Sequence, residues 1–283
     1  MSKIVIVTES GSDLSAELAK EYGVHIVPMH VSFGDVTKDD GFFPSTEIGD
    51  YFNITGQVPM TSGCNPQDFQ RVFEEILDME PEACILHLAY SAATTCSYQS
   101  AITAAEGNPN IRSVDTKNVS VGLACIVVRM ARLLKRHPEW TLDQAAEVAG
   151  EISKKARFCF VPGQLDYLKA GGRVSNKVAL IGNILNIHPR IDLMDGTLIA
   201  TQKYRGKIDR ILTRILKEYP IEEQLDQKEL WICYTPKFPE TSQELAVKLA
   251  KQMGFQRVHM VKTGGVITSH SGPNSFGVAA FTK

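Results

Sequence analysis

The sequence has little of what marks metal-binding, disulfide-rich or membrane-spanning proteins. Its six cysteines are scattered and include no Cys-x-x-Cys pair, so their spacing offers neither a zinc site nor a disulfide framework. No apolar run approaches the roughly 20 residues that cross a bilayer. The apolar part of the N-terminal stretch MSKIVIVTES is too short for a secretory signal. We therefore expect a cytoplasmic protein with no metal site and no stable membrane insertion.

An excess of charge of either sign is also absent. The 283 residues carry 30 basic and 32 acidic side chains, a formal net charge of -2. This balance gives no reason to expect binding to nucleic acid or to an anionic membrane surface. Hydrophobic residues make up 43% and charged residues 22%, so the chain can bury the core of one large domain or two smaller ones.

The common catalytic and cofactor motifs are missing. No GxGxxG follows the first apolar strand, and the sequence contains no GxxxxGK[ST] phosphate loop, GxSxG elbow or HExxH helix. These absences disfavour dinucleotide binding, P-loop chemistry, α/β-hydrolase chemistry and zinc-protease chemistry. We expect no resident cofactor.

Strand and helix patterns alternate through the first half of the chain. Short apolar runs predict strands over residues 4–7, 25–33, 84–89 and 111–115. Between them, the patterns predict helices over 13–22, 44–52 and 66–77, a helix ending at Gly107, and helices over 121–135 and 141–155. The acidic, Gly-containing stretch 34–41 predicts a loop. Because parallel strands need crossover helices, this order predicts a mostly parallel sheet with helices on both faces.

The second half of the chain has a different order of elements. It predicts a strand at 158–161, a helix at 165–170, a β-hairpin over 187–202 turning at Asp195-Gly196, helices at 207–219 and 241–253, and strands at 230–234, 258–261 and 276–282. This order predicts a second α/β domain with a mixed sheet. We place the boundary so that the domains comprise residues 1–156 and 157–283.

Small hydroxyl side chains cluster in three turns at the predicted strand ends. In the stretch VPMTSGCNPQDF, Thr61 and Ser62 precede a helix that Asn65 caps with the help of Asp68. The three groups are Thr8, Ser10 and Ser12; Thr61 and Ser62; and Ser91, Thr94, Thr95 and Ser97. If the sheet brings them together, they form a neutral cradle for a carboxylate or phosphate. Alternatively, they only cap helices and fill turns.

Two further side chains are candidates for such a site. His270 falls in SHSGPNSFG, which we expect to be a loop before the last strand that can aim the imidazole into a cleft. Arg173 projects from KAGGRVSNK, where its guanidinium either binds an anion or ties loops together. The apolar stretches GLACIVV and ALIGNILNI either line a lipid tunnel or belong to the ordinary core.

Eight segments in order resemble the DegV family along nearly the whole chain: TESGSDL, PMTSGCNPQDF, SAATTCSYQSA, VDTKNVSVG, LDYLKAGGRVS, IHPRIDLMDGTL, QKYRGK and SHSGPNSFGVAAF. The resemblance implies the two-domain DegV-like (EDD) fold, with one long-chain fatty acid bound between an N-terminal and a C-terminal α/β domain. It also implies a carrier role, in which the bound carboxylate is presented to a separate ATP-dependent fatty acid kinase subunit that forms an acyl phosphate for phospholipid synthesis.

The resemblance also assigns residues. Thr61 and Ser62 match the family's Thr-Ser pair beside the carboxylate, His270 matches the histidine of its C-terminal loop, and Arg173 matches its Gly-Arg-hydrophobic-Ser motif. Arg205 matches an arginine that faces the kinase partner. The usual Thr-Ser-Gln-Pro-Ser is here Thr-Ser-Gly-Cys-Asn, at residues 61–65.

A second departure affects the third hydroxyl turn. The usual Ser-Ser-x-Leu-Ser-Gly-Thr-Tyr is here Ser-Ala-Ala-Thr-Thr-Cys-Ser-Tyr, at residues 91–98. Ser91 or Thr95 is therefore expected to take the place of a carboxylate-binding serine.

Two other functions remain open from the residues alone. One is a hydrolase or transferase in which a Ser or Thr of these turns attacks an acyl substrate with His270 as base. The other is a phosphocarrier. The carrier interpretation, which we favour, assigns no catalytic residue to this chain and leaves catalysis to the partner kinase.

Overall fold

The computed structural model describes residues 2–175 and 187–283. Most of the stretch ALIGNILNI lies outside the described residues.

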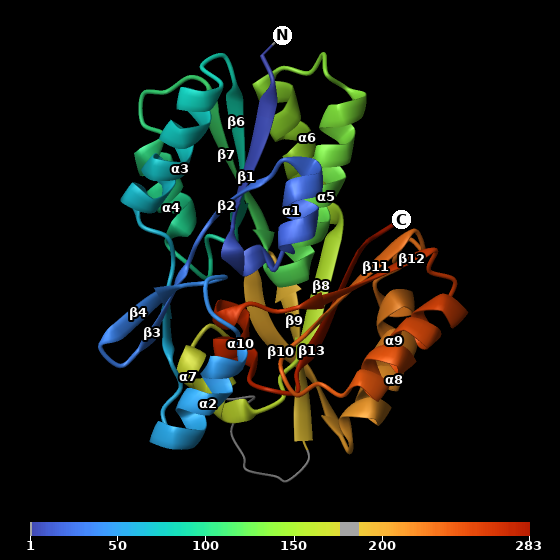
Figure 1. The fold of residues 1–283 in the computed structure, drawn as a ribbon. Helices are drawn as coiled ribbons and strands as arrows, with labels where there is room; N and C mark the ends of the chain where they lie inside the picture. The colour runs from blue at the N-terminus through green and yellow to red at the C-terminus, as the bar shows by residue number, and fades with distance from the viewer. Residues whose placement is uncertain (1, 176–186) are drawn as a thin grey trace.

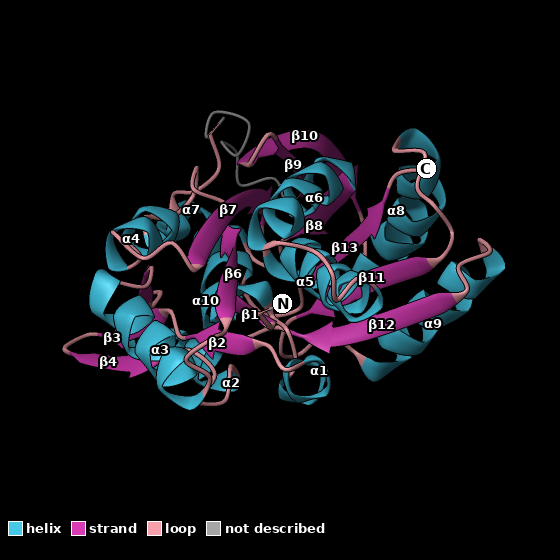
Figure 2. Ribbon diagram, turned by 90° about the horizontal axis from the view of Figure 1, so that it is seen from above, coloured by secondary structure: helices cyan, strands magenta, loops and turns pink. Residues whose placement is uncertain are grey.

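The first half of the chain builds a parallel sheet. Its strand order is β2 (His25–Val27), β1 (Ile4–Glu9), β6 (Cys84–Tyr90) and β7 (Ile111–Asn118), and every neighbouring pair is parallel. Helices cover both faces, as Figures 1 and 2 show: α3 (Pro66–Met79) and α4 (Ser97–Ala104) lie on one side, and α1 (Ala16–Tyr22), α5 (Ser120–Arg136) and α6 (Leu142–Lys155) on the other. The predicted mostly parallel sheet is confirmed.

A small antiparallel sheet beside it was not expected. Its order is β4 (Val36–Asp39), β3 (His30–Phe33) and β5 (Met60–Ser62), and α2 (Thr46–Thr55) follows β4 in the chain. The predicted strand 25–33 is therefore wrong as one element, because it divides around Pro28 into strands of two sheets, and proline cannot donate to a sheet ladder. The loop prediction for 34–41 is also wrong, since Val36–Asp39 pairs with β3.

The second half builds a six-stranded mixed sheet, as predicted. Its order is β10 (Thr197–Arg205), β9 (Ile187–Met194), β8 (Ala156–Val161), β13 (Phe276–Phe281), β11 (Glu229–Tyr234) and β12 (Arg257–Lys262), with only β11 and β12 parallel. Helices α8 (Ile208–Glu222) and α9 (Glu240–Gln252) pack on it. The hairpin turns at Asp195 and Gly196, whose φ angles of 47° and 80° are those of a tight primed turn.

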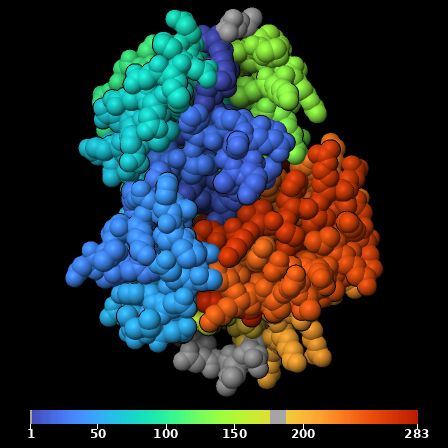
Figure 3. All heavy atoms as spheres, in the orientation of Figure 1, coloured from blue at the N-terminus to red at the C-terminus, as the bar shows by residue number. Residues whose placement is uncertain are grey.

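Helix α5 lies between the two larger sheets. It contacts β1, β6 and β7 of the parallel sheet and β8, β11 and β13 of the mixed sheet, which explains why its sequence is apolar almost all round. The stretch GLACIVV belongs to this shared core. The two halves pack closely, as the blue-to-green and orange-to-red parts of Figure 3 show. The boundary at 156/157 stays a prediction, although the parallel sheet ends at residue 118 and the mixed sheet begins at 156.

Two short helices lie where the halves meet. Helix α7 (Leu165–Gly171) packs against α10 (Gly265–Ser271), and α10 also contacts α2, β3 and β5. The expected loop at 269–277 is therefore wrong at its start, because His270 lies in the last turn of α10. No side chain next to α10 in the chain caps its N-terminus, so local sequence gave no helix signal.

No helix within residues 2–175 and 187–283 is long and apolar enough to cross a membrane. In the same residues, no three His, Cys, Asp or Glu side chains come together as a metal site.

Candidate ligand-binding site

A cavity lies between the two halves of the chain. It has an empty volume of about 730 Å³, part of which opens to solvent. The wall includes Thr61 and Thr94 from the first half and Phe158, Leu198 and His270 from the second. The site therefore exists only because the halves are packed together.

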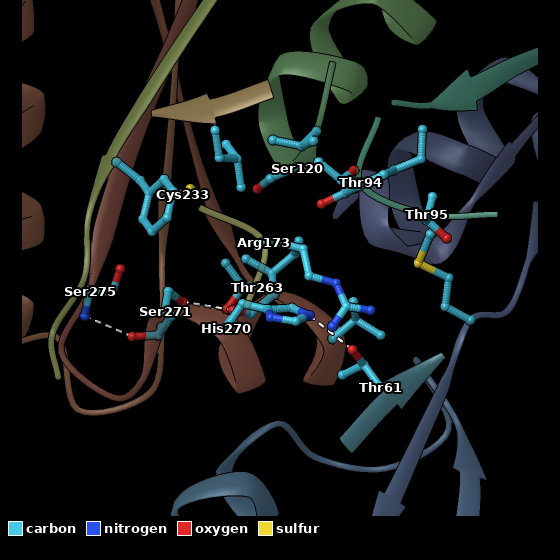
Figure 4. A pocket seen from close by; sticks show the side chains of 18 of the residues that line it. Thr61, Thr94, Thr95, Ser120, Arg173, Cys233, Thr263, His270, Ser271 and Ser275 are labelled. Atoms are coloured by element: carbon cyan, nitrogen blue, oxygen red, sulfur yellow. Dashed lines mark hydrogen bonds between the residues drawn. The ribbon is translucent and has the colours of Figure 1, made fainter. Parts of the chain in front are cut away.

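A hydrogen bond between Thr61 and His270 joins the two halves of the chain at the cavity wall. Thr61 lies on β5 and His270 on α10, and 2.8 Å separates Thr61 Oγ1 from His270 Nε2, as the dashed line in Figure 4 shows. Strand β5 is held by pairing with β3, and α10 packs against both of these strands. The sequence places these two residues 209 positions apart, and the structure brings them into direct contact.

The surroundings of His270 keep its imidazole neutral. Burial, reinforced by the positive charge of Arg173, lowers the pKa of His270 to about 4. Its Nδ1 is buried and has no hydrogen-bond partner among the described residues. A Cβ on Gly171 would lie 2.2 Å from this nitrogen, so the close approach of α7 needs glycine there. A buried N–H without a partner is costlier than a bare acceptor, which favours the tautomer with the proton on Nε2.

In that tautomer, Nε2–H donates to Thr61 Oγ1, and the threonine hydroxyl proton is free to donate into the cavity. The pair thus offers a neutral donor fixed in place by a buried ring.

Arg173 supplies a positive charge at this end of the cavity. It follows α7, is exposed, and lines the cavity, with its guanidinium beside the Thr61–His270 pair in Figure 4. Its Nη1 also donates to the carbonyl of Gly171 at 2.7 Å. The two roles considered for this arginine, anion binding and tying loops together, are therefore compatible.

The other hydroxyls at this end lie on the first half of the chain. Ser62, Thr94 and Thr95 also line the cavity, and Thr95 Oγ1 lies 3.1 Å from the hydroxyl of Ser97. A Cβ on Gly63 would lie 2.2 Å from Thr95 Oγ1. Gly63, which stands where the family usually has glutamine, thus leaves the space that the hydroxyls of Thr95 and Ser97 occupy at the start of α4.

Two candidate residues lie elsewhere. Ser91 is buried and is not part of the described cavity wall, and its hydroxyl donates to the carbonyl of Gly196 at 2.7 Å. Arg205 is exposed at the end of β10, also away from the wall.

The first hydroxyl turn, at Thr8, Ser10 and Ser12, is not part of the described cavity wall. Thr8 donates to the carbonyl of Leu88, Ser10 donates to Asp40, and Ser12 accepts from the N–H of Leu14. Of the three turns considered for the cradle, two contribute side chains to the wall.

The apolar wall was not found from the sequence. Phe158 and Phe160 on β8, Leu198 on β10, and Val266 on α10 line the cavity, as does Tyr90 at the end of β6. The phenylalanines are two residues apart on one strand, and their ring centroids lie 6.0 Å apart. Because residues at this spacing share one face of a strand, the alternation on β8 could have indicated that the two rings lie side by side. Apolar walls with neutral donors and one cation at one end suit an amphiphile with a single anionic group.

The fold and the site together define a class of α/β proteins in which a cavity lies between a half built on a parallel sheet and a half built on a mixed sheet. The family model described as "Uncharacterised protein, DegV family" matches residues 3–283, and the chain belongs to this family. It is 28% identical to a DegV domain-containing protein of Caldanaerobacter subterraneus subsp. tengcongensis, over 98% of both chains.

Solved structures are similar over the whole length. A fatty-acid-binding DegV family protein from Thermus thermophilus superposes with a TM-score of 0.88 at 26% identity, covering 99% of this chain and 100% of the other. A stearic acid-binding protein from Eubacterium ventriosum superposes with a TM-score of 0.85 at 26% identity, covering 100% of this chain and 99% of the other.

Proposed function

We propose that this chain binds one long-chain fatty acid in the cavity between its halves, with the carboxylate at the Thr61–His270 pair. The observation that carries the proposal is the neutral Thr61 hydroxyl, held by His270 and with Arg173 beside it, at one end of a cavity whose other walls are largely apolar. Similarity to fatty-acid-binding relatives over the whole chain supports it.

The energetics of such a complex are reasonable. An anion in a buried site stays ionised only if several donors reach it, and each hydrogen bond to a charged group contributes about 1.5–3 kcal/mol. Thr61, Ser62, Thr95 and Arg173 are among the donors that line the cavity. The alkyl chain supplies most of the affinity, since each buried methylene contributes about 0.8 kcal/mol before the cost of ordering.

The geometry disfavours the two alternative functions. A hydrolytic base needs its second nitrogen oriented by an acid or a carbonyl, and His270 Nδ1 has no such partner among the described residues. A phosphocarrier needs an accessible histidine nitrogen, and Nε2 is engaged with Thr61. The chain therefore fits a carrier better than a catalyst.

Titration of the delipidated protein with palmitate and oleate tests the binding step. One site per chain is expected, and the absence of heat and of ligand retention for both acids would reject fatty acid binding.

As the second part of the proposal, the bound carboxylate is presented to a separate ATP-dependent kinase, with Arg205 at the contact. The test is acyl phosphate formation, trapped with hydroxylamine, when loaded protein is mixed with ATP and a bacterial fatty acid kinase subunit. Arg205→Glu should slow this reaction while leaving palmitate retention intact. Lys251→Glu makes the same charge change on α9, where the lysine is exposed, and should leave the rate unchanged. Equal rates for both variants would remove Arg205 from the contact.

A further inference from the structure

Two buried carboxylates outside the cavity wall hold the N-terminus of α10. Asp13 and Asp40 are 6% and 3% exposed. Asp13 Oδ1 accepts the N–H of Gly264 at 2.8 Å, and Asp40 Oδ1 accepts those of Gly265 at 2.6 Å and Val266 at 3.4 Å. Three consecutive amides of the second half of the chain are thus bonded to side chains of the first half.

The second oxygen of each carboxylate is also engaged. That of Asp13 accepts from the hydroxyl of Ser120, and that of Asp40 accepts from the hydroxyl of Ser10 at 2.9 Å. Asp13 and Ser120 have φ angles of 55° and 47°, a region unfavourable for residues with a side chain unless the surroundings impose it. The backbone is therefore strained at both ends of this contact.

The approach of α10 to the first half leaves no room for side chains at its start. A Cβ on Gly264 would lie 2.8 Å from Asp40 Oδ1, and one on Gly265 would lie 2.4 Å from the ring of Phe43. The two glycines thus allow the close contact with Asp13 and Asp40. These two carboxylates cap the N-terminus of α10, which no neighbouring side chain in the chain does.

The carboxylates share a buried environment without a bonded cation among the described residues. Burial, with a smaller contribution from the charge of Asp40, raises the pKa of Asp13 to about 8, although the hydrogen bonds from Ser120 and Gly264 lower it; burial raises the pKa of Asp40 as well. The other titratable groups that sense Asp13 are Tyr90 on β6 and Cys233 on β11, and burial raises the pKa of both, that of Cys233 to about 12. Arg173 is the nearby cation that acts on Tyr90.

We propose that Asp13 and Asp40 are positioning residues for the ligand site, and that ionisation of both at alkaline pH loosens α10 and weakens ligand binding. They act through α10, which carries His270 and the wall residue Val266. The direction of the bond between Asp13 and Ser120 depends on the proton: in the ionised form Oδ2 accepts from the Ser120 hydroxyl, and in the protonated form Oδ2–H donates to Ser120 Oγ, while Oδ1 accepts from Gly264 in both forms. When both carboxylates are charged, two buried anions bonded to adjacent amides repel each other. This inference rests on the proposed fatty acid binding only where palmitate affinity is measured.

The pH window from 7 to 9.5 isolates this effect. A monomeric fatty acid and His270 do not change charge there, because a monomeric carboxylic acid titrates well below it and the pKa of His270 is about 4; the palmitate is therefore kept below the concentration at which it aggregates. The affinity of the wild-type protein for palmitate is expected to fall about tenfold across the window, as is usual for linked sites.

The first test is the pH profile of palmitate affinity, measured by calorimetry at pH 7 and 9.5. Asp13→Asn places an amide where the neutral acid stands, able to accept from Gly264 and donate to Ser120, so the profile should flatten. Asp35→Asn is the matched control, since Asp35 is an exposed carboxylate in the turn between β3 and β4, and it should keep the wild-type slope. A flat wild-type profile, or a wild-type slope in Asp13→Asn, would overturn the switch.

The second test is hydrogen exchange of the peptide covering residues 264–272, which needs no ligand. Asp40→Ala should speed exchange of these amides about tenfold, and Asp35→Asn should not change it. Unchanged exchange in Asp40→Ala would overturn the positioning role even if palmitate binds. Faster exchange in a protein that ignores palmitate would keep the positioning role and reject the proposed function instead. If Asp40→Ala does not fold, Asp40→Asn and the wild-type pH series decide in the same way.

Discussion

Replacement of Thr61 by valine tests the proposed head-group contact most sharply. The change keeps the shape of the side chain and the β-branched preference of β5 but removes Oγ1, which lies 2.8 Å from His270 Nε2. In the proposed complex, the Thr61 hydroxyl donates a hydrogen bond to the ligand carboxylate. A hydrogen bond to a charged group contributes about 1.5–3 kcal/mol, which corresponds to a roughly 10- to 150-fold rise in the Kd for palmitate.

The assay is calorimetric titration of delipidated protein with palmitate at pH 7.5, beside urea unfolding of the same samples. Thr61→Ser keeps the hydroxyl and should retain most of the affinity. Thr55→Val is the matched control, because the exposed Thr55 hydroxyl bonds only to nearby backbone, donating to the carbonyl of Tyr51 and accepting the N–H of Gln57. A Kd for Thr61→Val equal to that of the wild type, with normal stability, would refute the assignment of Thr61 to the carboxylate.

Three further predictions follow from the same contacts. Gly63→Ala places a methyl group 2.2 Å from Thr95 Oγ1 and should destabilise the protein by about 1–3 kcal/mol in urea unfolding; unchanged stability would mean that the start of α4 yields easily. Ser91→Ala removes the bond to the Gly196 carbonyl and should cost about 1 kcal/mol of stability without weakening palmitate binding, whereas a large loss of affinity would return Ser91 to the head-group site. Because the pKa of His270 is lowered from 6.5 to about 4, the unfolded chain gains a proton first as the pH falls across this window. Stability of the ligand-free protein should therefore decline with acid, less steeply in His270→Gln, and equal slopes in urea unfolding would contradict the neutral buried ring.

The features that sequence predicted correctly are those whose causes lie close together in the chain. Asn65 and Asp68 form the expected reciprocal cap, because the cap needs only four consecutive residues. The hairpin at Asp195-Gly196 turns where expected, because the turn type depends on those two residues. The alternation of apolar strands and helices likewise predicts the parallel sheet, since right-handed crossovers leave few other arrangements.

The features that it missed depend on distant partners. Strand β5 has three residues and exists only because β3 lies beside it. Helix α10 is capped by Asp13 and Asp40, more than 220 positions earlier in the chain. No local pattern reports such partners.

For the site, the motifs predicted Thr61, His270 and Arg173, which the structure brings together at one end of the cavity. They did not reveal that Ser91 is engaged with the hairpin. They also did not reveal that Phe158 and Phe160 face the cavity, because the face of a strand that is covered depends on how two sheets pack.

The most direct test of a fatty acid held between the two halves is native mass spectrometry of the protein as purified from bacteria, followed by solvent extraction of the bound molecule. The account predicts a mass increase of one fatty acid per chain, which is lost on delipidation and restored by added palmitate or oleate. A protein that is purified empty and gains no mass with either acid would contradict it.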